Sequence, residues 1–130
     1  TELVPANAVE SSAYDEAYNM FINGNYAGAI TQFNHFLQSY PNSSLAPGAA
    51  YWVGNAHYAS RDFQEAINAQ ERLVSTYPDS SKAADGLLNI ASSQQEMADG
   101  KAAKKTLEDL ITRYPFSDAA ERAKQRLANL

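Results

Sequence analysis

The sequence predicts an all-α, right-handed superhelical solenoid made of three helix pairs and a C-terminal capping helix. The first observation behind this prediction is that Tyr-Pro pairs begin at Tyr40, Tyr77 and Tyr114, at intervals of 37 residues. The second is that each interval holds two apolar stripes with the spacing of amphipathic helices. A fixed period in this range is typical of proteins in which stacked repeats bury one continuous core.

The N-terminal residues 1–10 are predicted to be the end of a linker, because Pro5 lies in a stretch with little amphipathic order. Regular structure is expected from near Ser11 onward. The repeat domain should then cover residues 11–130, with units at about 12–48, 49–85 and 86–122 and a cap over 117–130. A chain of 130 residues suits one domain with a core of its own.

Each unit is predicted to form a helix, a tight turn, a second helix and a proline stop. In the first unit the apolar stripes run over residues 13–21 and 29–37, and Gly24 breaks the helix between them. Pro41 ends the second helix, since a proline disfavours the helical conformation of the residue before it. The same register places the remaining breaks near Arg61, Pro78, Gly100 and Pro115.

Small residues and serines also recur at fixed positions of the units. The small residues should allow neighbouring helices to approach closely. The serines precede the next helix, where a hydroxyl can accept a hydrogen bond from a free backbone N–H. The four columns are Ala17, Gly54 and Ala91; Ala29, Ala66 and Ala103; Ser43, Ser80 and Ser117; and Ala46, Ala83 and Ala120.

The third unit and the cap differ from the rest of the chain. Gly100 stands where the other units carry Tyr26 and Phe63, so the third tight turn is expected to be looser. A polar outer face on the final helix is what a terminal repeat needs for solubility. In that helix Ala119, Ala123 and Leu127 are predicted to face inward, and Glu121, Lys124, Gln125 and Arg126 outward.

The composition excludes several kinds of protein. With 10 basic and 15 acidic residues the formal charge is −5, which argues against a nucleic-acid-binding surface. The absence of cysteine excludes a disulfide framework, a thiolate zinc site and a cysteine nucleophile. No apolar run approaches the roughly 18 residues of a membrane span, and Thr1 opens neither a signal peptide nor a lipidation site.

The sequence predicts no catalytic residue, no metal site and no cofactor. The only imidazoles are those of His35 and His57. His35 shares its column with Arg72 and Asp109, which indicates a solvated position, whereas His57 lies in a packing column. Neither histidine has a nucleophile or a further metal ligand in register.

The small-residue columns and the recurring prolines resemble the tetratricopeptide repeat, whose period is about 34 residues. The extra residues of each unit fall in the Tyr-Pro-x-Ser hinge, and this long form resembles the repeats of bacterial cell-envelope proteins. Residues 98–127, "ADGKAAKKTLEDLITRYPFSDAAERAKQRL", are similar to the C-terminal end of the periplasmic cell division coordinators of the Tol-Pal system, the YbgF/CpoB family.

This resemblance implies a non-enzymatic protein-binding module in the periplasm. It implies TolA as a partner, together with a peptidoglycan synthase complex, so that outer-membrane constriction is coordinated with septal peptidoglycan synthesis during cell division. It further implies that the full-length protein trimerises through an upstream coiled coil, whereas the isolated repeat domain is expected to be a monomer.

Another resemblance supports an alternative function. Similar units occur in a lipoprotein of outer-membrane protein assembly, although that family looks longer and starts at a lipidated cysteine. The chain would then be a repeat scaffold in that assembly, or another envelope adaptor that binds peptides.

The first helix of each unit is expected to line the concave face of the solenoid. Tyrosines suit a peptide groove there, because they bring a large contact area with few rotamers to restrict. The alternative for several of them is packing between repeats. The candidate binding residues are Tyr14, Tyr18, Phe21, Tyr51, Trp52, Asn55, Tyr58, Leu88, Ser92 and Gln95.

Two details of this face lead to more specific expectations. Trp52 is interpreted either as an exposed interface anchor or as a side chain covered by the longer hinge. Tyr14, Tyr51 and Leu88 stand where a clamp for a C-terminal carboxylate would carry basic residues. This disfavours such a clamp and favours an extended segment held by amides, hydroxyls and ring faces.

Overall fold

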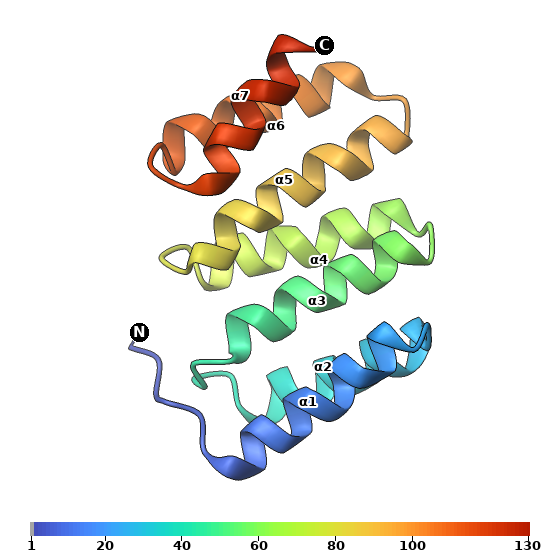
Figure 1. Cartoon of the computed structure of the whole chain (residues 1–130), viewed down its shortest axis with the longest axis vertical. Coiled ribbons are helices and arrows are strands. Elements are labelled where there is room, and N and C mark those ends of the chain that lie inside the picture. Colours follow the sequence, from blue (N-terminus) through green and yellow to red (C-terminus); the bar gives the residue numbers. More distant parts are fainter. Residues whose placement is uncertain (1) are drawn as a thin grey trace.

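The computed structural model describes residues 2–130, and Thr1, the first residue of the expected linker, lies outside that range. Within it the chain forms three successive helix pairs and one final helix, with no strands, which confirms the all-α prediction (Figure 1). None of these helices is both long and apolar enough to span a membrane. The helices are α1 (Ala8–Ile22), α2 (Tyr26–Ser39), α3 (Ala46–Ala59), α4 (Phe63–Thr76), α5 (Ser81–Glu96), α6 (Gly100–Arg113) and α7 (Asp118–Ala128).

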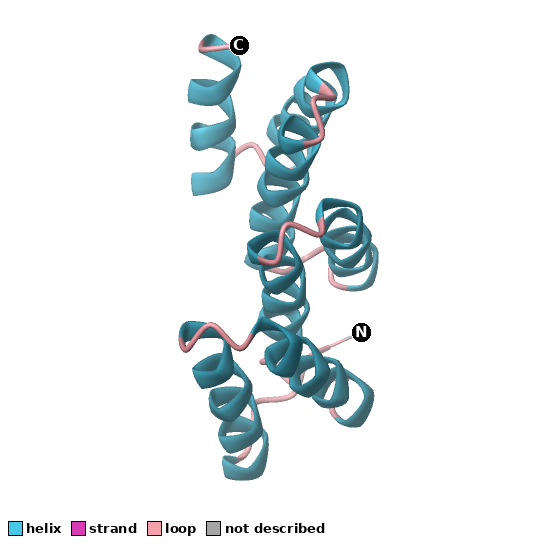
Figure 2. Cartoon of the chain, turned by 90° about the vertical axis from the view of Figure 1, so that its right-hand side faces the viewer, coloured by secondary structure: helices cyan, strands magenta, loops and turns pink. Residues whose placement is uncertain are grey.

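The helices lie in two layers. The odd-numbered helices contact one another directly, α1 with α3, α3 with α5 and α5 with α7, whereas the even-numbered helices contact only odd-numbered ones. The odd-numbered layer is therefore the inner side of the curve. Figure 2 shows α1 and α7 displaced to the same side of α3 and α5, which makes the face of the odd-numbered layer concave.

The hinges between units are tied to one another by the tyrosines of the Tyr-Pro pairs. The helices α2, α4 and α6 each end directly before such a pair. The Tyr77 hydroxyl donates a hydrogen bond to the Pro41 carbonyl at 2.7 Å, and the Tyr114 hydroxyl donates one to the Pro78 carbonyl at 2.8 Å. Each hinge thus fixes the position of the next, which stabilises the stacking of the units.

Each tight turn within a pair has one residue in the left-handed region of backbone conformations. The φ angle is 82° at Gly24 and 61° at both Arg61 and Ala98, three positions of one column. The third break therefore lies at Ala98, and Gly100 begins α6, which refines the expected break near Gly100. Because only glycine adopts this conformation without steric cost, the second and third turns carry backbone strain.

Each of the three hinge serines accepts a hydrogen bond from a backbone N–H, which confirms the expectation. Ser80 accepts a hydrogen bond from Lys82 N at 3.1 Å, and Ser117 accepts one from Ala120 N at 3.0 Å. Ser43 accepts one from Leu45 N at 3.2 Å, with the same two-residue spacing as at Ser80, although α3 begins only at Ala46.

The first helix begins at Ala8, earlier than the expected start near Ser11. The reason is Asn7, whose side chain accepts a hydrogen bond from Glu10 N at 2.9 Å and so caps the helix. This cap extends regular structure into the segment that the sequence assigns to a linker.

The segment before α1 is also held against the first hinge. Val4 N donates to Asn42 O at 2.8 Å, and Ser44 N donates to Val4 O at 2.7 Å. These bonds form an isolated parallel bridge between Val4 and Ser43. Residues near Val4 therefore lie against the repeat domain.

The core consists of the small-residue columns and the larger apolar side chains between them. The two columns of small residues within the pairs are buried, which confirms close helix packing. Gly54 shows how close this packing is, since a Cβ atom there would lie 2.1 Å from Gln70 Nε2. Gln70 is fully buried, although Phe33 and Leu107 fill the same position of the other units.

Candidate functional site

The N-terminal end of the concave face is a cluster of aromatic side chains from α1 and α3. The centroid of the Trp52 ring system lies 5.1 Å from that of Tyr18, 5.0 Å from Phe21 and 5.5 Å from Tyr51. All four side chains are half-buried. Trp52 is therefore covered partly by rings from α1 and not fully exposed. Edge-to-face and tilted packing holds the rings in place and leaves part of their surface accessible.

Tyr14 lies deeper between the helices than the other candidate tyrosines. Its ring packs edge-on against Phe33 and Phe36, at centroid distances of 5.4 and 6.0 Å. Its hydroxyl lies so close to Gly48 that a Cβ atom there would be 2.8 Å away. Burial raises the pKa of Tyr14, an effect that the nearby Trp52 side chain opposes. Tyr14 thus contributes to packing between the first two units.

A chain of amide hydrogen bonds crosses the middle of the face. The Tyr51 carbonyl accepts from Asn55 Nδ2 at 3.1 Å and from Gln70 Nε2 at 3.1 Å. Asn55 Oδ1 accepts in turn from Asn89 Nδ2 at 3.0 Å. Asn89 Oδ1 is buried and has no partner among residues 2–130. The chain therefore ends on a carbonyl oxygen that can accept one more hydrogen bond.

Tyr58 lies at the C-terminal end of α3, next to the tight turn. Its ring packs edge-on against Phe63 at 5.3 Å, and the Arg61 guanidinium lies 5.1 Å from the Phe63 ring on α4. Tyr58 is half-buried, so part of its ring remains at the surface.

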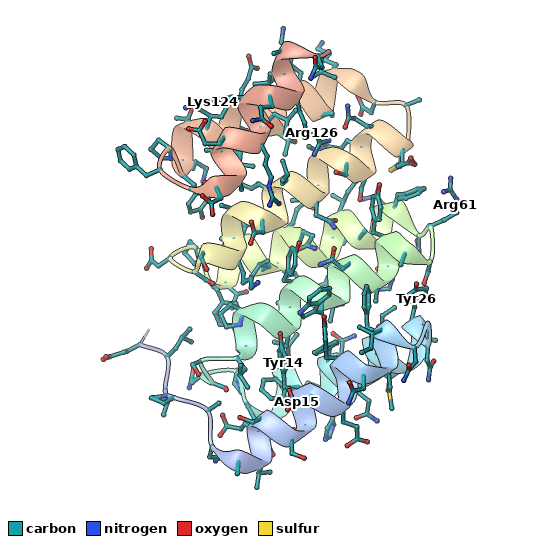
Figure 3. All side chains as sticks on the ribbon, in the orientation of Figure 1. Tyr14, Asp15, Tyr26, Arg61, Lys124 and Arg126 are labelled. Carbon is teal, nitrogen blue, oxygen red and sulfur yellow. The ribbon has the colours of Figure 1, made fainter. Side chains whose placement is uncertain are left out.

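The C-terminal end of the face is organised by Arg126 of α7. Arg126 Nη1 donates to the Leu88 carbonyl at 3.3 Å and to Ser92 Oγ at 3.1 Å, and Nη2 donates to Gln95 Oε1. Figure 3 shows this side chain extending from α7 toward α5. The expectation that Arg126 faces outward is therefore wrong, because its guanidinium finds three polar acceptors on α5.

The structure thus joins Leu88, Ser92 and Gln95 through a residue that sequence reasoning missed. The 37-residue spacing of the repeats could have indicated this position of Arg126. One further step of 37 residues along the column of Trp52 and Asn89 leads to Arg126. Burial lowers the pKa of this guanidinium, partly offset by Tyr58.

A polar pocket of about 370 Å³ lies between α3, α5 and α7. Burial raises the pKa of the Asp85 carboxyl, an effect that the nearby Lys82 and Arg122 oppose. Lys82 also lies 5.2 Å from the centroid of the Tyr51 ring. The pocket is lined by Tyr51, Lys82, Asp85, Leu88, Asn89, Ser92, Asp118, Arg122 and Arg126.

The two histidines lie apart from this face or at its margin. His35 is exposed on α2, in the outer layer. His57 is half-buried on α3, with its Nδ1 atom 3.9 Å from Asp62 Oδ2. Neither side chain reaches the polar pocket between α3, α5 and α7.

Comparison with protein families finds a match over most of the chain. Residues 6–130 match the family model YfiO, described as outer membrane lipoprotein. Two relatives named cell division coordinator CpoB, from Pseudomonas putida, are 39% identical over 57 residues. That alignment covers 44% of this chain and 21% of the relatives, so it spans about a fifth of their length.

Several solved structures share the fold. The type III secretion translocator chaperone SycD of Yersinia enterocolitica has a TM-score of 0.74 and 16% identity, covering 95% of this chain and 92% of that one. The Sgt2 TPR domain of Aspergillus fumigatus has a TM-score of 0.72 and 20% identity, covering 99% and 83%. The N-terminal domain of STI-1 from Caenorhabditis elegans has a TM-score of 0.75 and 12% identity, covering 92% and 98%. These likenesses confirm a tetratricopeptide solenoid.

Proposed function

The chain belongs to the YfiO family of outer membrane lipoproteins, and from that membership we propose that it is a protein-binding module of the bacterial cell envelope. The tetratricopeptide solenoid is a scaffold that typically binds proteins. The observation that carries the proposal is the concave face, where half-buried rings of α1 and α3 lie beside the amide chain of Asn55 and Asn89. Such a face offers both apolar contact and hydrogen bonds to a polypeptide.

The bound polypeptide is an extended segment that crosses the odd-numbered helices. Its side chains contact Tyr18 and Tyr58, which keep part of their rings at the surface. Aromatic side chains at the centre of a face are frequent anchors of an interface. The amide groups in the middle of the face fix the backbone of the segment, as an exposed sheet edge would do for an added strand.

The partner that we favour is the periplasmic part of TolA, and the process is cell division. Support comes from the similarity to the CpoB coordinators and from the resemblance of residues 98–127 to that family. In this role the chain works in the periplasm and helps to coordinate outer-membrane constriction with septal peptidoglycan synthesis, together with a peptidoglycan synthase complex. The full-length protein trimerises through an upstream coiled coil.

Titration calorimetry with the periplasmic part of TolA tests this function. The variants Tyr18→Ala, Asn55→Ala and Tyr58→Ala should each weaken binding by about 1 to 3 kcal/mol, the usual range for an interface anchor. Lys104→Ala and Glu108→Ala change exposed residues of α6 and should leave binding unchanged. Thermal unfolding of each variant separates loss of the interface from loss of the fold.

Normal binding by all three concave-face variants, at unchanged stability, would show that this face is not the interface. If TolA does not bind the parent chain, TolA is not the partner. The protein-binding function would then be tested with other envelope proteins.

A second candidate function is a scaffold role in outer-membrane protein assembly. The observation in its favour is that the outer membrane lipoprotein family matches residues 6–130. The same titration with an unfolded outer-membrane β-barrel protein distinguishes the two functions. Binding of that protein in place of TolA, weakened by the same concave-face variants, would favour the assembly role.

A further inference from the structure

The pocket between α3, α5 and α7 gathers positive charge on an acidic chain. Three of the ten basic residues, Lys82, Arg122 and Arg126, line it. None of the three forms an ion pair within residues 2–130, where the pairs found are His57–Asp62, Lys105–Asp109 and Lys124–Glu121. Within residues 2–130, no carboxylate lies close enough to these three cations to form an ion pair with them.

Arg126 lines the pocket and retains hydrogen-bonding capacity. A guanidinium has five N–H donors, and three of those of Arg126 are used by the neutral acceptors on Leu88, Ser92 and Gln95. Two N–H donors of Arg126 remain without a partner. Burial lowers the pKa of this guanidinium because it disfavours the charged form. A carboxylate is the acceptor that suits such a group best, since charge-assisted hydrogen bonds are the strongest kind.

The pocket also contains an acceptor and two carboxylates. Asn89 Oδ1 is buried without a partner, and a polar atom in this state is stabilised by an N–H donor. Asp85 and Asp118 offset part of the positive charge. Three cations and two carboxylates leave a net charge of about +1, which one further carboxylate would neutralise.

We infer that this pocket binds a carboxylate of an extended peptide segment, and that the Asn89 side chain turns on binding so that its buried Oδ1 accepts from a neighbouring backbone N–H of the segment. The carboxylate accepts from the two remaining donors of Arg126 and is attracted by Arg122 and Lys82. The cations come from α5 and α7, and not from the positions of Tyr14, Tyr51 and Leu88 where the sequence lacks basic residues. The inference rests on the proposed function, because it states that the polypeptide segment bound on the concave face carries a negatively charged carboxylate.

Short N-acetylated peptides test the inference without TolA. One carries a central glutamate and an amidated C-terminus, the second has glutamine in its place, and the third is the glutamine peptide with a free C-terminal carboxylate. Each is titrated into the ¹⁵N-labelled chain while the Arg126 Nε–Hε and Asn89 side-chain signals are followed by NMR. A glutamate peptide that shifts both signals identifies a side-chain carboxylate as the ligand, and the third peptide identifies a terminal one. Equal shifts, or none, with all three peptides would overturn the inference.

Variants with matched charge changes provide the control. Arg126→Gln should weaken binding of the carboxylate peptide about tenfold, the loss expected for one charge-assisted hydrogen bond. Arg122→Gln removes only an electrostatic attraction at an exposed position and should weaken binding about threefold. Lys104→Gln and Lys124→Gln remove the same charge outside the pocket and should change affinity by less than about twofold. Arg122 makes no hydrogen bond within the described residues, so its variant avoids the loss of α7 docking that Arg126→Gln risks.

The outcomes separate this inference from the proposed function. If TolA binds and loses affinity with Tyr58→Ala but not with Arg122→Gln, the pocket inference is wrong and the binding function stands. If the carboxylate peptide binds at Arg126 while TolA does not bind, the pocket is real and the proposed partner is wrong.

Discussion

The substitution Gly54→Ala tests the packing on which the binding face rests. The added Cβ atom would lie 2.1 Å from Gln70 Nε2 and 2.4 Å from Gln70 Cδ. Gln70 must then move and give up its hydrogen bond to the Tyr51 carbonyl, the group that also holds Asn55. The variant therefore acts on both the core of the second unit and the amide chain of the face.

Three contributions determine the size of the effect. Leaving the amide of the buried Gln70 unpaired costs about 1 to 3 kcal/mol, and overfilling a packed core costs a similar amount. The higher helix propensity of alanine stabilises the variant by about 1 kcal/mol. We expect a net loss of about 1 to 5 kcal/mol, which lowers the melting temperature of a domain of this size by about 3 to 15 °C.

The assay is thermal and urea unfolding of the parent chain and three variants. Gly100→Ala is the matched control, because a Cβ atom there meets nothing within 4 Å and φ is not positive. Its stability should be unchanged or slightly higher. The double variant Gly54→Ala/Gln70→Leu copies the third unit, where Ala91 and Leu107 are both fully buried, and should regain most of the loss. A Gly54→Ala variant as stable as Gly100→Ala would refute the close contact.

Three further outcomes are expected. Tyr114→Phe removes the hydrogen bond to the Pro78 carbonyl and should cost about 0.5 to 1.5 kcal/mol in urea unfolding; no loss would mean that this bond does not stabilise the hinges. Burial raises the pKa of Asp85, so its ionisation opposes folding as pH rises through the folded-state pKa. Asp85→Asn should therefore raise the melting temperature at pH 7, with a gain that shrinks below the ordinary aspartate pKa; a lower melting temperature at pH 7 would contradict this. Sedimentation of residues 1–130 should show a monomer, and a trimer independent of concentration would contradict that prediction.

Much of the fold can be predicted from the sequence because its determinants are local. A proline just after a helix end, a serine before a helix start and a small residue at a close contact each act through the backbone near them. Once Tyr40, Tyr77 and Tyr114 fix the register, these signals recur at the same positions. The pairing of Val4 with the first hinge could not be predicted in this way, since it joins backbone groups that no side-chain pattern marks.

The candidate site was harder to predict because its polar residues depend on tertiary partners. Gln70 stands in a column with Phe33 and Leu107, and only the nearby Tyr51 carbonyl explains why an amide is stable there. The sequence predicts Arg126 on the outer face, because charged residues of a capping helix are usually solvated. Its inward position arises from three acceptors on α5 that a helical wheel of α7 does not contain.

The most direct test of the binding face is site-specific photo-crosslinking to the periplasmic part of TolA. A photoreactive amino acid is placed at Tyr18, Tyr58 or Gln95 of the concave layer, or at Arg72 or Lys105 of the outer layer. The proposed function predicts crosslinks to TolA from the first three positions and none from the last two. Crosslinks confined to Arg72 and Lys105 would place the partner on the outer layer and contradict the assignment of the concave face.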